Sequence, residues 1–103
     1  MSMSDKAILK GKEVIEVSNL REWGMFFENK ESRRVAVDEV NGARVSTVFL
    51  GVDHSWGYGP KLWFETMIFG GEHDGFQDRY TTWDEAEAGH KRVVEALKKG
   101  ESP

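Results

Sequence analysis

The dipeptide Asn41-Gly42 constrains the fold more than any other feature of this 103-residue sequence. A two-residue type I′ turn needs positive φ at both central positions, which Asn and Gly tolerate, and its twist matches that of the strands it joins. Runs rich in β-branched residues flank the dipeptide, at residues 34–40 and 43–52. The sequence therefore predicts that these two runs pair as an antiparallel hairpin.

Further strand-like runs follow the hairpin. Residues 62–69 are mostly apolar or β-branched and are predicted to return antiparallel to the preceding strand. The connection at residues 53–61 contains Gly57, Gly59 and Pro60, which interrupt a strand ladder, so it is predicted to form a projecting loop. Residues 76–81 are predicted to add one more strand.

The N-terminal part predicts a strand and then a short helix. Residues 7–17 carry several apolar side chains around a break at Gly11, and the regular strand is placed at residues 12–17. Ser18 or Asn19 can cap a helix, because a short side-chain acceptor satisfies an unpaired backbone N–H there. Trp23 and Phe27 then recur at helical spacing from Leu20.

The C-terminal part carries the clearest helix signals. Thr82 and Glu85 fit the capping box T-x-x-E, and Gly100 is suited to close the helix. One face of this helix collects Trp83, Ala86, His90, Val93, Val94 and Leu97. His90 is therefore predicted to point inward or to an edge of the core.

These elements predict an α+β fold: an antiparallel sheet of four to five strands, a short helix after the first strand and a C-terminal helix packed on one face. The length suits one domain over residues 1–103, with residues 1–6 and 100–103 expected to be flexible.

Composition excludes several classes of function. The net charge of −4 argues against a general nucleic-acid binder, which usually carries a basic patch or stripe. Without cysteine, the chain has no disulfide framework or thiolate metal site. Its apolar runs are shorter than a membrane span, and its start lacks the apolar core of a signal peptide, so a soluble cytoplasmic protein without membrane association is expected.

Aromatic side chains on or beside the 53–61 loop are the leading candidate binding site. Flat rings combined with a few donors suit stacking on a base and gripping a phosphate. The alternative is that the rings fold over the sheet edge as a lid on the core. The candidate residues are His54, Trp56, Tyr58, Trp63, Arg79 and Tyr80.

Acidic and histidine side chains supply weaker candidates. Asp53, His54, His73, Asp74 and His90 are metal-ligand types, but their spacing matches no recognised motif, so no metal or cofactor is predicted.

Glu65 lies among Trp63, Met67 and Phe69, and a carboxylate in such surroundings must find a partner, reach water or have a raised pKa. Glu65 and His90 can form either an acid/base pair or a structural hydrogen bond, and no catalytic residue is assigned.

Three motifs carry a resemblance to a known family. Residues 45–54 (VSTVFLGVDH), 64–71 (FETMIFGG) and 78–90 (DRYTTWDEAEAGH) resemble a family of small hypothetical proteins of bacteriophages and prophages, over about residues 13–97. The resemblance implies a phage accessory protein in the bacterial cytoplasm. Small proteins of that kind are often host-takeover or anti-defence factors.

The predicted function is non-catalytic binding. Residues 53–60 and 70–80 are expected to form one pocket or interface that captures a small nucleotide-like signal or a host protein, and a homo-oligomer stays open. The alternative is a small hydrolase that uses Glu65 with His54 or His90.

Overall fold

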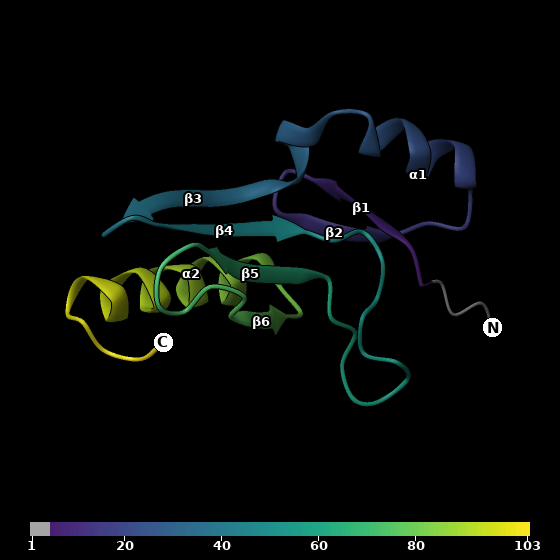
Figure 1. Cartoon of the computed structure of the whole chain (residues 1–103). Helices are drawn as coiled ribbons and strands as arrows, with labels where there is room; N and C mark the ends of the chain where they lie inside the picture. The colour runs from purple at the N-terminus through teal and green to yellow at the C-terminus, as the bar shows by residue number, and fades with distance from the viewer. Residues whose placement is uncertain (1–4) are drawn as a thin grey trace.

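The structure of the protein, a computed structural model, describes residues 5–103 and has an α+β architecture (Figure 1). In chain order its elements are β1 (Ala7–Lys10), β2 (Glu13–Glu16), α1 (Leu20–Phe27), the 3-10 helix η1 (Lys30–Arg33), β3 (Arg34–Val40), β4 (Ala43–Phe49), β5 (Phe64–Phe69), β6 (Gln77–Tyr80) and α2 (Trp83–Lys98).

The central sheet is an antiparallel meander of four strands in the order β3-β4-β5-β6. Asn41 and Gly42 have φ values of 50° and 82°, and Val40 pairs with Ala43 across them. The predicted hairpin is therefore confirmed. However, β4 ends at Phe49, because Gly51 has a positive φ of 76° and Val52 pairs instead with Lys6 in an isolated bridge.

The prediction of a single N-terminal strand at residues 12–17 is wrong. β1 and β2 form a hairpin around Gly11, in which Ile8 pairs with Ile15, and this hairpin is a separate two-stranded sheet. Gly11 has a φ of 61°, a conformation that glycine adopts without steric penalty, so the residue reverses the chain and does more than interrupt a strand. The helix α1 thus follows two strands.

The predicted flexibility of residues 1–6 falls partly outside the described residues, because residues 1–4 are not described. The next two residues are held by backbone contacts. The carbonyl of Asp5 accepts a hydrogen bond from the Asp53 N–H at 2.9 Å, and Lys6 forms the bridge with Val52.

Both helices begin where their capping residues predict. The Asn19 side chain accepts hydrogen bonds from the backbone N–H groups of Arg21 and Glu22, which satisfies two of the unpaired donors of α1. Both hydrogen bonds of the capping box between Thr82 and Glu85 are present at the start of α2.

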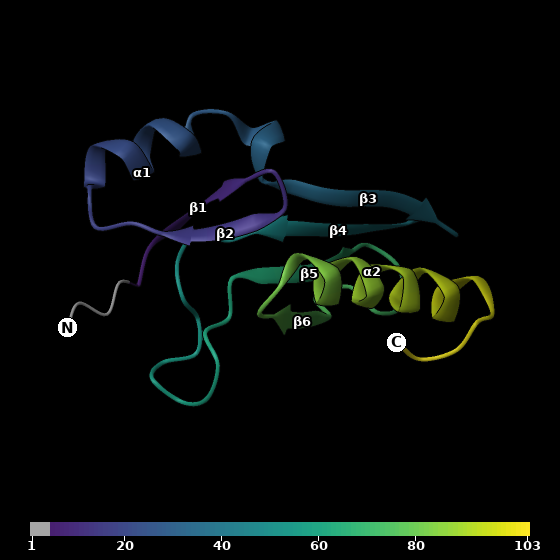
Figure 2. The ribbon, with the colours of Figure 1, turned by 180° about the vertical axis from the view of Figure 1, so that it is seen from behind.

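One face of the central sheet is covered by α2 and by the β1–β2 hairpin (Figure 2). Side chains alternate along β4, so Val45, Thr47 and Phe49 all point to this face and are buried. The core under the hairpin and the start of α2 contains Ala7, Leu9, Phe49, Trp63, Phe64, Tyr80 and Ala86. The core under the rest of α2 contains Val40, Ala43, Val45, Ile68, Val93 and Val94.

Candidate functional site

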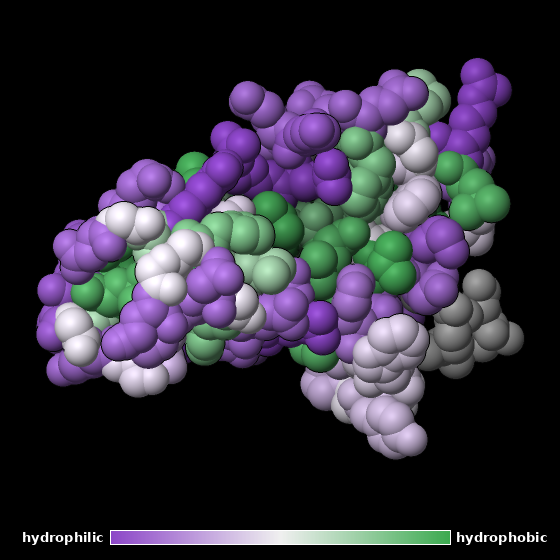
Figure 3. All heavy atoms as spheres, viewed as in Figure 1, coloured by the Kyte–Doolittle hydropathy of each residue, from purple (hydrophilic) through white to green (hydrophobic). Residues whose placement is uncertain are grey.

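The connection between β4 and β5, residues 50–63, projects from the body of the molecule (Figure 1) and forms a separate protrusion in the space-filling view (Figure 3). Its tip exposes two large rings: Trp56 is 80% exposed and Tyr58 is 84% exposed. Trp56 has a φ of 57°, which is uncommon for a bulky residue and is often associated with functional sites. We call Trp56, Gly57 and Tyr58 the aromatic tip.

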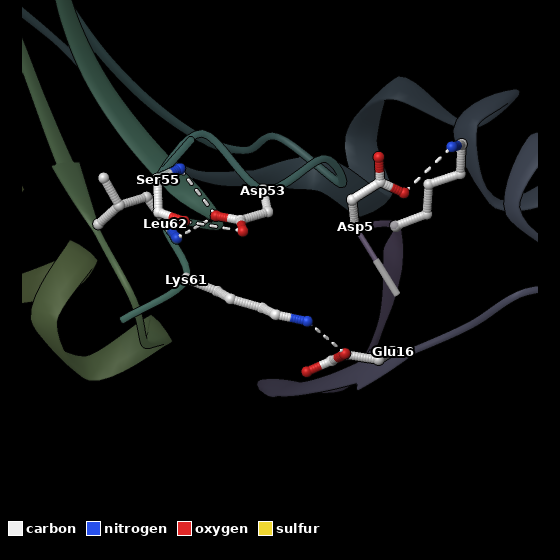
Figure 4. Close-up of polar contacts among 7 residues, drawn as sticks. Asp5, Glu16, Asp53, Ser55, Lys61 and Leu62 are labelled. Carbon is white, nitrogen blue, oxygen red and sulfur yellow. Dashed lines mark hydrogen bonds and ion pairs between the residues drawn. The ribbon is translucent and has the colours of Figure 1, made fainter. Parts of the chain in front are cut away.

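At the base of the loop, the carboxylate of Asp53 is hydrogen-bonded to both limbs of the loop (Figure 4). One carboxylate oxygen accepts hydrogen bonds from the backbone N–H of Ser55 at 2.8 Å and of Leu62 at 2.9 Å, and the other accepts from the Ser55 hydroxyl at 2.8 Å. The N–H of His54 also donates to the carbonyl of Leu62 at 3.0 Å. Asp53 thus links the outgoing limb of the loop to the returning limb.

The pKa of Asp53 reflects these contacts. Burial alone raises it, but the hydrogen bonds from Leu62 and Ser55, together with the positive charge of Lys61, hold the pKa below its ordinary value. The charged form of Asp53 is therefore the form that fixes the loop base.

Lys61 connects the returning limb to the N-terminal hairpin. Its ammonium group forms an ion pair with Glu16 of β2 at 2.8 Å and lies 5.8 Å from the centre of the Trp63 ring (Figure 4 shows the ion pair). The loop base is thereby held against β2 as well as against the central sheet.

The structure separates the six residues that the sequence grouped as a binding site. Trp56 and Tyr58 lie at the tip, and His54 lies in the base of the same loop, where its Nδ1 is 2.8 Å from the Val52 carbonyl oxygen. Trp63 and Tyr80 are 4% and 7% exposed and belong to the core. Covering the core is therefore the role of Trp63, while the exposure of Trp56 and Tyr58 does not fit a lid.

Arg79 and Tyr80 are engaged with other side chains. Arg79 forms an ion pair with Glu65 at 3.0 Å, and the Tyr80 hydroxyl donates to the Thr66 hydroxyl oxygen at 3.1 Å. Burial raises the pKa of Tyr80, and the nearby Asp78 carboxylate raises it further. The expected single pocket built from residues 53–60 and 70–80 is not assembled from these side chains.

Glu65 and His90 do not meet, because they lie on opposite faces of the sheet. Glu65 alternates with Thr66, which points toward α2 and contacts Thr47, whereas Glu65 pairs with Arg79 on the other face. His90 is 3% exposed and lies inside, as its helical spacing predicts. This arrangement gives no support to an acid/base pair of Glu65 and His90.

The partners of His90 were not predicted from the sequence. Its Nδ1 lies 2.7 Å from the Thr47 hydroxyl oxygen and its Nε2 lies 2.7 Å from a carboxylate oxygen of Asp38. A signal for Asp38 was present: the register set by the Asn41-Gly42 turn pairs Asp38 with the core residue Val45, which places an acidic side chain on the helix-covered face.

The described residues carry few features of other classes of site. Within residues 5–103, no group of three or more His, Cys, Asp and Glu side chains is arranged to hold a metal ion. No helix in this part of the chain has the length and apolar character needed to cross a membrane. Five surface cavities in this part of the chain are lined by other residues and by neither ring of the aromatic tip.

Comparison with protein-family models, with curated proteins and with solved structures finds no match. Among the described residues, the aromatic tip exposes two large rings on one short segment.

Proposed function

We propose that this chain is a non-catalytic binding protein that inserts its aromatic tip into a recess on a protein partner. The observation that carries the proposal is the nearly complete exposure of Trp56 and Tyr58 on a loop whose base is fixed by Asp53. Tryptophan and tyrosine are enriched among the residues that dominate binding energy at protein interfaces, because they bury a large area with few rotatable bonds.

The shape of the loop favours a protein partner over a free nucleotide. A small ligand is usually held in a concave site that surrounds most of its surface. The aromatic tip is a projection, and the rings that would have closed a pocket, Trp63 and Tyr80, are in the core. A projecting loop suits the opposite arrangement, in which the loop enters a concavity of its partner.

The hydrogen bonds at the loop base favour binding with little loss of conformational entropy. Ordering a flexible loop on binding reduces affinity, and a loop already held in one conformation avoids part of that loss. Asp53 joins Ser55 and Leu62 on either side of the tip, which supports such pre-organisation.

The partner class follows from the resemblance to phage proteins. A phage accessory protein acts in the cytoplasm of its bacterial host, so we propose a bacterial host protein as the partner and antagonism of a host defence as the consequence. This part of the proposal depends on the resemblance alone.

The test compares two double variants of the full chain. Trp56→Ala with Tyr58→Ala removes the tip, whereas Leu20→Ala with Met25→Ala removes two other exposed apolar side chains, which are 65% and 61% exposed. Each protein is used to capture partners from a bacterial lysate, the captured proteins are identified by mass spectrometry, and affinity for the purified partner is measured by calorimetry.

The tip variant is expected to bind at least about 30-fold more weakly, since a dominant interface residue contributes about 2 kcal/mol or more. The control is expected to bind as wild type does. A folded tip variant with wild-type affinity would overturn the proposal.

Native mass spectrometry of the protein recovered from the lysate separates the other functions. If the wild type retains a small molecule that the tip variant does not, the partner is a small ligand and not a protein. A molecule converted by the protein would favour the hydrolase that the sequence left open.

A further inference from the structure

A chain of hydrogen bonds crosses the full width of the sheet beneath α2. From Asp38 on β3 it passes to His90 on α2 at 2.7 Å, to Thr47 on β4 at 2.7 Å and to Thr66 on β5 at 2.5 Å. It ends at Tyr80 on β6, whose hydroxyl is 3.1 Å from the Thr66 hydroxyl oxygen.

The residues in the middle of this hydrogen-bond chain are polar, although apolar side chains of similar size would fill the same space. Thr47 and Thr66 are fully buried and His90 is 3% exposed. Valine has nearly the shape of threonine, and a buried hydroxyl is tolerated only when it is hydrogen-bonded. Each of these polar groups therefore needs a hydrogen-bond partner, and the direction of each hydrogen bond depends on the protonation of His90.

With a neutral His90, all donors run toward Asp38. A neutral imidazole has one donor and one acceptor, and the carboxylate of Asp38 requires the donor at Nε2. Nδ1 then accepts from Thr47, the Thr47 oxygen accepts from Thr66, and the Thr66 oxygen accepts from Tyr80. Every hydroxyl hydrogen in the chain has one acceptor.

With a protonated His90, the hydroxyls reverse. Both ring nitrogens now donate, so Nδ1 donates to Thr47, Thr47 donates to Thr66, and Thr66 donates to Tyr80. The Tyr80 hydroxyl then needs another acceptor. Asp78 lies two residues before Tyr80 on the same face of β6 and is paired with Thr66 in the sheet register, so its carboxylate is the acceptor nearest in the strand. In agreement, burial raises the pKa of Tyr80 and the Asp78 carboxylate raises it further. The chain is thus satisfied in both charge states of the histidine.

We propose that this chain is a proton-driven relay, in which protonation of His90 reverses the hydroxyls of Thr47 and Thr66 and turns the Tyr80 hydroxyl from Thr66 to Asp78. Asp78 also forms an ion pair with Arg92 of α2 at 3.4 Å. Tyr80 and Arg92 line one surface recess. Uptake of a proton by His90, beside β3, therefore changes the hydrogen bond of the Tyr80 hydroxyl at the surface recess beside β6.

Charged groups near the relay lie at its two ends. At the His90 end, Asp38 of β3 and the α2 residues Lys91, Glu95 and Lys98 line one recess with the imidazole. At the other end are Asp78 of β6 and Arg92 of α2. The strands between them contribute Thr47 and Thr66 to this face, while Arg44 and Glu65 point to the opposite face of the sheet.

The test follows two nuclei during a pH titration of the full chain. Long-range ¹H–¹⁵N spectra report the tautomer and protonation of His90, and ¹³C labelling of the tyrosine Cζ reports the Tyr80 hydroxyl, between about pH 8 and about pH 5. We expect the Nε2–H tautomer at the upper pH and a shift of the Tyr80 signal with the same midpoint as His90. Tyr58, 84% exposed on the loop, is the internal control and should not follow.

Thr66→Val interrupts the relay with little change of side-chain shape. Ser46→Ala is the matched control, because the Ser46 side chain precedes Thr47 on β4 and points to the opposite face of the sheet. In Thr66→Val we expect His90 to titrate while the Tyr80 shift is lost; in Ser46→Ala the shift should persist. Two results in the state of His90 would overturn the relay: an Nδ1–H tautomer, or a ring that stays neutral until the protein unfolds. Two results in the Tyr80 signal would also overturn it: no change in the wild type when His90 is protonated, or a change with the His90 midpoint that persists in Thr66→Val. The wild-type titration decides the question even if Thr66→Val does not fold.

Discussion

Replacing Gly89 by alanine should destabilise the protein, although alanine is the better helix former. Gly89 is buried within α2, against the side chain of Tyr80 on β6. A Cβ at this position would overlap the Tyr80 hydroxyl oxygen and two of its ring carbons. The ring cannot swing away freely, because it belongs to the core and its hydroxyl is bonded to Thr66.

The expected magnitude is the difference of opposing effects. Glycine in a helix interior is less favourable than alanine by roughly 0.5–1 kcal/mol, which the substitution recovers. Overpacking a core typically destabilises by roughly 1–3 kcal/mol, and displacement of Tyr80 also weakens a hydrogen bond that contributes about 1 kcal/mol. The net loss should be about 2 kcal/mol, which lowers the melting temperature by roughly 8–16 °C in a domain of this size.

Gly24 in α1 provides the matched control, since nothing other than its chain neighbours and the backbone of its own helix lies within 4 Å of the position of its missing Cβ. Gly24→Ala should raise stability by roughly 0.5–1 kcal/mol, because only the helix preference changes. Urea unfolding followed by circular dichroism and tryptophan fluorescence measures both variants. A Gly89→Ala protein as stable as wild type would refute the close contact between α2 and Tyr80.

Two further predictions concern the turn and the loop base. Gly42→Val should lower the free energy of unfolding by about 1 kcal/mol or more, because valine is strained at a φ of 82°, and an unchanged melting temperature would argue against this turn. Asp53→Asn should lower stability by about 1 kcal/mol near neutral pH, where the hydrogen-bonded carboxylate is charged. Because folding lowers the pKa of Asp53, the stability that its carboxylate contributes is present above the ordinary pKa of aspartate and is lost as the pH falls through the folded-state pKa. The urea midpoints of the wild type and Asp53→Asn should therefore converge in acid. Equal differences at neutral and acidic pH would contradict this role.

The elements that sequence reasoning located are those in which local and tertiary preferences agree. Asn41-Gly42 favours a tight turn by itself, and the strands on both sides of it have apolar residues for one face. The capping box of α2 likewise precedes a regular apolar stripe. Such signals need no knowledge of distant parts of the chain.

The N-terminal hairpin was missed because a single glycine has two interpretations. Gly11 between two apolar runs is compatible with a break before one strand or with a reversal between two strands. Only the surroundings decide, since Ala7 and Leu9 of β1 become buried against Phe49 and Phe64 of the central sheet. That contact depends on residues 40 to 57 positions away, which the local pattern does not contain.

The burial of Trp63 was missed as well. The sequence places Trp63 in the candidate site because it lies beside the 53–61 loop, and strict alternation along residues 62–69 would put it on the face of Glu65. Instead, β5 begins at Phe64, and the backbone before it is held by bonds from Leu50 to the Trp63 carbonyl and from the Trp63 N–H to Tyr80. Trp63 therefore joins the core beneath the β1–β2 hairpin, an element absent from the predicted fold.

The aromatic tip and the buried relay make independent demands on the sequence. The tip needs rings that the core does not use, and Asp53 holds the loop outside the sheet so that Trp56 and Tyr58 remain largely exposed in the folded protein. The relay needs polar groups where the core would favour apolar ones, at Thr47 and Thr66. Neither choice adds apolar packing to the core, so these are positions at which we expect a role beyond packing. Because one lies on a projecting loop and the other beneath α2, failure of either test leaves the other unaffected.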